Sequence, residues 1–320
     1  MKALNSILLT AILLLTASKV EAHSGTVNWN GWTFNWAVSN AALSEGMVIR
    51  NLNYNGQKIM HKGSIPVIRV RYFCNNCGGG NKDNQCIQCG PYADKIGIDK
   101  LANIDWSYCT GQRTCSRTYT DNRGVQWLEI GMYAIYGNYK LYYVWYFSST
   151  GFFRPCVFSR GLQHNAAHDH HVYFRLDFDI KGAGDDQVFV YDNNRGNIGW
   201  GNGWSKYMNE VHDTKNPATK RFWYITDKLP RNGSYAVQVL PSDHDGVADA
   251  WCTKDIGLRR YYYAEDIGWA FWATTNLPYF DNQNIADSDV VFWYVGHLHH
   301  EAHDGADEWH NTGPWLYVKS

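Results

Sequence analysis

The chain has 320 residues and a formal net charge of −1 at pH 7, so a general electrostatic attraction to nucleic acid or acidic membranes is not expected. Aromatic residues make up 16% of the chain, with 15 Trp and 22 Tyr, a content that favours β structure and large buried aromatic clusters. No apolar stretch is long enough to span a membrane.

Residues 1–22 have the pattern of a secretion signal. Lys2 gives a short basic start, Ile7 to Leu15 an apolar core, and Val20-Glu21-Ala22 an acceptable small-residue cleavage site. The pattern predicts a secreted, extracellular protein whose mature chain begins at His23. We expect one domain over residues 23–320, because no linker-like boundary interrupts the chain.

Strand-like segments follow one another along the chain, separated by clusters of Gly, Asn and Asp. No long amphipathic helix, repeat or heptad pattern competes with them. The pattern predicts an all-β protein folded as one large antiparallel β-sandwich. The segments are Val67–Tyr72, Gln126–Phe147, Val172–Ile180, Gln187–Tyr191, Arg221–Ile225, Tyr235–Leu240 and Val290–Val295.

Two groups of histidines lie in these strand-like segments. His168 and His170 are one residue apart, and a further pair, His299-His300, follows about 130 residues downstream. Alternate residues of a strand point to the same face, so His168 and His170 can bind one ion together. A third imidazole from the distant strand would complete a metal site, and neutral imidazoles suit copper. The alternative is a set of surface histidines in a His-rich segment.

Six segments, in the same order, resemble the catalytic domain of copper amine oxidases, and together they cover most of the chain after residue 22. The amino-terminal domains usual in that family have no counterpart here, so the chain resembles a minimal and divergent member. The segments are Glu45 to Ile49 with Asn55-Gly56; Val70-Arg71-Tyr72; Gly137-Asn138-Tyr139 with Trp145 and Phe147; His168-Asp169-His170 with Arg175-Leu176-Asp177; Asn216 to Arg221; and Asp289 to Trp293 with His299-His300.

The resemblance implies a supersandwich of the amine-oxidase type with copper and a built-in quinone. Copper would be bound by His168, His170 and His300, because the ungapped match from Asp289 selects His300 over His299. Tyr139, in the Asn138-Tyr139 pair, would be oxidised to topaquinone, which accepts the two electrons that no ordinary side chain can take. The structural alternative for Tyr139 is a core aromatic, since Tyr133 to Phe147 is rich in such residues.

The implied activity is oxidation of a small primary amine by oxygen to an aldehyde, ammonia and hydrogen peroxide. Asp94, in Tyr92-Ala93-Asp94, would be the general base, with Tyr92 as a gate and Tyr72 hydrogen-bonded to the quinone. The alternative for Asp94 is an ordinary acidic residue in a solvated loop. The alternative for Tyr72 is an aromatic residue of a strand.

The alternative hypothesis is that the protein is a catalytically inactive relative, which acts as a secreted structural or copper-binding protein. Ile135 and Lys140 favour it, because the family has Ser or Thr at the first position and Asp or Glu at the second.

A calcium site is also implied by the resemblance. Its ligands would be carboxylates and backbone carbonyls, a mixture of oxygens that suits calcium. The alternative is a pair of ordinary acidic residues at the strand edge. The residues are Asp177, Phe178, Asp179, Asp289 and Val290.

The eight cysteines of a secreted chain favour disulfides. Two Cys-x-x-Cys pairs also have the spacing of a structural zinc site, which stays the alternative for them. Cys109 and Cys115 are expected to close a short loop, and Cys156 and Cys252 to pair. By the resemblance the protein would form a homodimer. The two Cys-x-x-Cys pairs are Cys74 with Cys77 and Cys86 with Cys89.

Overall fold

The computed structural model describes most of the chain after residue 22. Nearly all of its regular structure is β-strand, and the sheets are antiparallel throughout, as the sequence predicts. No helix among the described residues is long and apolar enough to cross a membrane. The described residues are 23–72, 92–103, 112–161, 167–193, 195–196, 198–227, 235–243, 245–249, 252–263, 281–301 and 308–319.

The first sheet carries the candidate metal ligands. Its described strands run in the order β1-β2-β3-β4-β10-β17-β16-β13, and β5 pairs with β4. Its strands are β1 (Ser24–Trp29), β2 (Trp32–Val38), β3 (Met47–Tyr54), β4 (Gln57–Tyr72), β5 (Tyr92–Asp94), β10 (His168–Phe178), β13 (Val211–Asp213), β16 (Ile256–Arg260) and β17 (Val290–His300).

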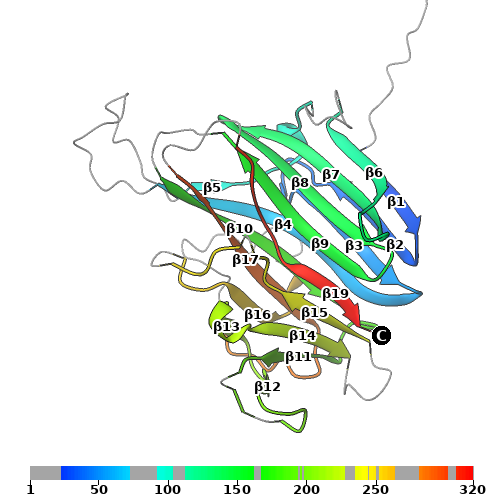
Figure 1. The fold of residues 1–320 in the computed structure, drawn as a ribbon, viewed down its shortest axis with the longest axis vertical. Helices are drawn as coiled ribbons and strands as arrows, with labels where there is room; N and C mark the ends of the chain where they lie inside the picture. Colours follow the sequence, from blue (N-terminus) through cyan, green and yellow to red (C-terminus); the bar gives the residue numbers. More distant parts are fainter. Residues whose placement is uncertain are drawn as a thin grey trace, which may run out of the picture.

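The second sheet lies against the first and closes the sandwich (Figure 1). Its described strands run in the order β12-β11-β14-β15-β19-β9-β8-β7-β6, and β18 pairs with β9. They are β6 (Thr114–Thr120), β7 (Gln126–Tyr136), β8 (Tyr139–Ser148), β9 (Phe152–Arg160), β11 (Asp186–Tyr191), β12 (Trp204–Lys206), β14 (Phe222–Asp227), β15 (Ala236–Leu240), β18 (His310–Thr312) and β19 (Trp315–Lys319).

Two short 3₁₀ helices, η1 (Ile98–Lys100) and η2 (Pro217–Thr219), complete the named elements of the described residues. Asn216 precedes η2, and its side chain accepts a hydrogen bond from the Thr219 N–H. Pro217 then occupies the first helical position, where its missing N–H costs nothing.

A tight hairpin divides the segment Gln126–Phe147, which the sequence shows as one continuous strand signal. The chain turns at Gly137 and Asn138, and Tyr136 pairs with Tyr139 across the turn. Gly137 has a φ of 58°, a conformation that favours glycine in a two-residue turn. Tyr139 is therefore the first residue of β8.

The pair β10–β17 forms the centre of the first sheet (Figure 1). Both strands are buried along almost their whole length, because β8 and its neighbours cover one face and loops cover the other. The register places His168 opposite His300 and Phe178 opposite Val290. β17 thus continues beyond the predicted Val290–Val295 and brings the distal histidines alongside the first pair.

The main core fills the space between the two sheets with aromatic and aliphatic side chains. Trp32, Trp145 and Trp223 are among its fully buried members, and burying each large apolar side chain contributes about 1.5–3 kcal/mol. A smaller cluster, including Tyr173 and Trp293, lies on the opposite face of β10 and β17. The first sheet is consequently covered on both faces at its centre.

Candidate active site and metal centre

Three buried histidines converge on the inner face of the first sheet. One ring nitrogen from each of His168, His170 and His300 lies within 4.8 Å of the others, and the ring centroids are 4.9–5.0 Å apart. His168 and His170 share a face because they alternate along β10, and the register brings His300 beside them. This triad, the copper ligands that the sequence analysis expects, could hold a metal ion.

His299 is placed elsewhere. Its Nδ1 lies 2.6 Å from Asp169 and its Nε2 lies 3.3 Å from Glu301. The side chain is more than one third exposed and belongs to the opposite face of β17. The structure therefore brings His300, and not its neighbour, into the triad.

The triad fits a cation of the copper class. Both ring nitrogens of His170 are buried and have no hydrogen-bond partner among the described residues. Burial, and then the neighbouring histidines, hold the pKa of His170 well below its ordinary value, so the ring is neutral. Three buried imidazoles form a donor set that suits copper. A bound ion would also satisfy the two nitrogens of His170, since a buried polar atom without a partner is costly.

Tyr139 reaches the triad from the second sheet. Its hydroxyl lies 2.9 Å from His168 Nε2 and 2.8 Å from the Tyr72 hydroxyl. Burial, and then the neighbouring Tyr139, raise the pKa of Tyr72, so Tyr72 keeps its proton. The expected cofactor tyrosine and its expected hydrogen-bond partner are thus in contact. Asn138 lies beside Tyr139 in the turn.

A cavity of about 290 Å³ opens beside Tyr139 and contains the predicted base. Asp94 is 9% exposed and pairs with Ile68 as part of β5, so it is not the solvated loop residue of the alternative reading. Burial raises the pKa of Asp94 to about 7. The lining residues are Val70, Tyr72, Tyr92, Asp94, Tyr136, Gly137 and Tyr139.

Tyr92 lies at the wall of this cavity, with its ring centroid 6.0 Å from that of Tyr72. Two further residues near the site, Tyr136 and His310, were not predicted from the sequence. Tyr136 lines the cavity, and the ring of His310 lies 4.4 Å from that of His300. The hairpin position of Tyr136, opposite Tyr139, is a signal that could have found the first. His310 has no comparable signal, because its strand pairs with β9 in the other sheet.

The expected calcium ligands Asp177, Asp179 and Asp289 also converge, with one oxygen of each within 4.8 Å of the others. Lys58 forms an ion pair with Asp179. Burial, and then the nearby Asp179, raise the pKa of Asp289 to about 6. This acidic cluster lies where Phe178 pairs with Val290, at the far end of β10–β17 from the histidines.

The predicted pairing of Cys156 with Cys252 is wrong. Both are buried free thiols, and they lie in different layers: Cys156 in β9 of the second sheet, and Cys252 against Tyr173 of the first. Cys115 is disulfide-bonded, while Cys109 lies outside the described residues. The signal segment 1–22 and the two Cys-x-x-Cys pairs, within 73–91, also lie outside them.

Comparison with solved structures gives the class of fold. A copper-containing benzylamine oxidase from Hansenula polymorpha matches with a TM-score of 0.69 at 14% identity, over 98% of this chain and 63% of that one. An Aspergillus nidulans amine oxidase matches at 0.71 and 14%, over 92% and 51%. A Pichia pastoris lysyl oxidase matches at 0.69 and 12%, over 99% and 56%.

The chain therefore has the fold of the copper amine oxidases, and the resemblance read from the sequence is confirmed at the level of the fold. It spans only about one half to under two thirds of the length of these structures. No family model matches the sequence, and no curated protein does. The likeness is thus carried by the fold rather than by overall sequence.

Proposed function

We propose that this protein is a secreted copper- and quinone-dependent oxidase of primary amines. The reaction takes a primary amine, oxygen and water to an aldehyde, ammonia and hydrogen peroxide. One observation carries the proposal: the buried hydroxyl of Tyr139 lies 2.9 Å from a member of a histidine triad inside the fold of the copper amine oxidases. The amine oxidase activity of the similar structures supports the reaction class by analogy.

His168, His170 and His300 would hold copper, and Tyr139 would be the precursor of topaquinone. Together these groups supply the two-electron acceptor that ordinary side chains lack. The remaining residues of the site would bind the amine and position the reacting groups. Tyr72 orients the oxygen of Tyr139 through their 2.8 Å hydrogen bond.

Asp94 is the proposed general base for the α-proton of the amine. A general base is most effective when its pKa lies near the working pH, and burial brings the pKa of Asp94 to about 7. The cavity it shares with Tyr139 has a volume of about 290 Å³, at the lower limit of small-molecule sites. Its largely aromatic lining favours small amines with an apolar side chain.

The test of the proposal is Tyr139→Phe in the full chain loaded with copper. We expect the wild type to give a redox-cycling quinone stain and to release peroxide from a small primary amine. The variant should lose both and keep its copper, because the three histidines are unchanged. The matched control is Tyr136→Phe, which alters the cavity wall and leaves the hydroxyl beside His168 in place.

Two outcomes contradict the proposal. Staining that persists in Tyr139→Phe would remove Tyr139 as the cofactor precursor. A wild-type protein that binds copper without ever staining would favour the inactive copper-binding relative, with Ile135 and Lys140 as the departures that accompany it.

A further inference from the structure

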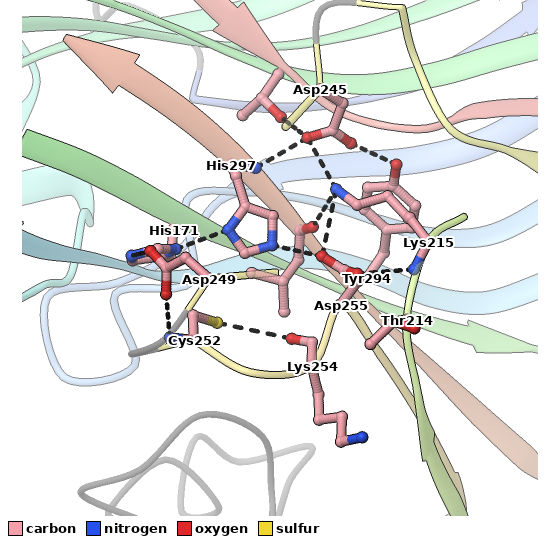
Figure 2. A network of polar contacts seen from close by, with 12 residues as sticks. His171, Thr214, Lys215, Asp245, Asp249, Cys252, Lys254, Asp255, Tyr294 and His297 are labelled. Atoms are coloured by element: carbon pink, nitrogen blue, oxygen red, sulfur yellow. Dashed lines mark hydrogen bonds and ion pairs between the residues drawn. The ribbon is translucent and has the colours of Figure 1, made fainter. Parts of the chain in front are cut away.

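A second buried histidine pair lies on the opposite face of β10–β17. His171 and His297 are directly opposite each other in the register, and both are buried. Since side chains alternate along a strand, they point away from the triad. Their Nδ1 atoms face one another (Figure 2), and the distance between them is 2.8 Å.

A thiol completes this group. The sulfur of Cys252 and one ring nitrogen from each histidine all lie within 4.8 Å of one another. Cys252 is fully buried, and its sulfur makes long contacts of 3.6 Å with the Tyr173 hydroxyl and with the Lys254 carbonyl. Burial raises the pKa of the Cys252 thiol to about 11, so without a metal the sulfur is a neutral thiol beside two imidazoles.

We infer that His171, His297 and Cys252 form a second metal site, for a thiophilic transition-metal ion, zinc or copper(I). Thiolate and imidazole together are the ligands that these two ions prefer. The site is separate from the copper site of the proposed function and does not depend on it.

The ligand spacing suits such an ion after small movements. Metal–nitrogen bonds of about 2.0–2.1 Å and a metal–sulfur bond of about 2.3 Å place two tetrahedral nitrogen ligands about 3.3–3.4 Å apart, and a nitrogen and the sulfur about 3.5–3.6 Å apart. The two Nδ1 atoms, at 2.8 Å, would move apart by about half an ångström. The sulfur already lies within 4.8 Å of one nitrogen of each ring.

A carboxylate contacts the far nitrogen of the His297 ring, as carboxylates do for metal-bound histidines, and a second carboxylate lies near the far nitrogen of His171. Asp255 Oδ1 lies 2.6 Å from His297 Nε2, and Asp249 Oδ2 lies 3.8 Å from His171 Nε2. A His297 that donates from Nε2 to Asp255 presents an unprotonated Nδ1 toward His171. Asp255 therefore favours the tautomer of His297 that a metal ligand needs.

Asp255 is itself fixed by a buried lysine. The backbone N–H of Lys215 donates to Asp255 Oδ2 at 2.7 Å, and Lys215 Nζ lies 3.2 Å from Asp245 and 3.6 Å from Asp255 (Figure 2). Asp245 also accepts a hydrogen bond from the His297 backbone N–H at 2.8 Å. His297 is therefore held by contacts with Asp255, Asp245 and His171.

A polar cavity adjoins one of the three proposed ligands. His297 and Asp245 line a polar cavity of about 560 Å³ that also includes Asp243, His299 and His310. Acidic and imidazole groups along such a cavity attract a cation and replace its waters stepwise. A buried metal site needs a path of this kind.

The test compares two buried free thiols, Cys252→Ser and Cys156→Ser, in the reduced full chain. Cobalt(II) is the probe, because a thiolate ligand gives it a charge-transfer absorption. The wild type and Cys156→Ser should both show this absorption. Cys252→Ser should bind one cobalt ion fewer per chain, and its charge-transfer absorption should be weaker by the contribution of the Cys252 thiolate. Displacement by zinc(II) or copper(I) then identifies the preferred ion.

Equal cobalt stoichiometry and equal absorption in the two variants would overturn the inference. A second measurement uses the unmodified protein: in mild urea, zinc(II) should slow alkylation of Cys252 and leave that of Cys156 unchanged. Equal protection of the two thiols, or none, counts against the site even where Cys252→Ser does not fold. Neither readout involves a quinone or amine turnover, so failure here is distinct from failure of the proposed function.

Discussion

Asp94 lies on the short strand β5 with only 9% of its surface exposed, and burial raises its pKa to about 7. The same residue type at Asp99 is well exposed and paired with Lys100. The difference comes from the surroundings: Asp94 lies in a cavity wall beside Tyr72, Tyr92 and Tyr136, whereas Asp99 lies at the surface. At the scale of single residues, burial distinguishes the acid proposed as the general base from an ordinary surface acid.

We expect Asp94→Asn to lower kcat by about 10²–10⁴-fold, the usual contribution of a general base. The quinone stain of copper-loaded protein should persist, because Tyr139 and the triad are untouched. Steady-state oxidation of a small primary amine measures the loss. Asp99→Asn is the control and should turn over like the wild type; an Asp94→Asn enzyme with wild-type kcat would exclude Asp94 as the base.

The raised pKa of Asp94 also predicts a pH dependence. The carboxylate is the active form of the base, so kcat/KM should rise with pH through about 7. Stability moves the other way. The folded protein holds this proton more tightly than the unfolded chain, so the contribution to stability is full below the ordinary pKa of 3.8 and is lost as pH rises through about 7. A wild-type kcat/KM that does not change with pH in this range would contradict the role of Asp94 as the general base.

The pair β10–β17 organises three groups at the scale of elements. Its inner face carries the triad, its outer face carries His171 and His297, and its far end carries the acidic cluster. One antiparallel register sets all three, because a slip by one residue would move every side chain to the other face. Pairing between strands more than 100 residues apart therefore decides the chemistry of the sheet.

Calcium binding by the acidic cluster is the prediction at this scale. Three carboxylates that are close together repel one another, and a divalent cation offsets that repulsion. Calcium at 100 times its Kd should raise the free energy of unfolding by about 2.7 kcal/mol, seen as a higher thermal midpoint. The response should be lost in Asp289→Asn and kept in Asp287→Asn, two residues away and outside the cluster; an identical response in both variants would dismiss the site.

At the scale of the whole molecule, the two sheets meet through large aromatic side chains that need space on the facing strand. Trp145 of β8 extends toward β4 at Gly63, where a Cβ atom would lie 2.5 Å from the indole ring. Trp145 is fully buried, and its indole N–H donates to the Met47 carbonyl at 3.1 Å. The absence of a side chain at Gly63 thus sets how closely the layers approach.

We expect Gly63→Ala to destabilise the fold by about 1–3 kcal/mol, the usual effect of overpacking a filled core. The indole is held by its hydrogen bond and cannot retreat without losing it. Urea denaturation of the metal-free protein would measure the change. Gly196→Ala is the control, because a Cβ there would meet nothing within 4 Å. Equal midpoints for the two variants would show that the layers adjust freely.

The sequence by itself determined the class of fold and the local half of the site. Alternating β-branched and aromatic residues predict strands wherever the chain is half-buried, and the spacing of His168 and His170 already places two imidazoles on one face. The resemblance carried by the motifs added Tyr139 and His300. Each of these rests on neighbours within a few residues, or on segments matched in order.

Only the tertiary structure decided how distant segments meet. It joined His168 to His300 and Tyr139, buried Asp94, separated Cys156 from Cys252, and placed His171 beside His297 and Cys252. These contacts depend on strand register, sheet order and loop packing over long sequence separations. Local propensity does not encode them, because the same strand can pair with several partners until one arrangement buries the most apolar surface and satisfies the most polar groups.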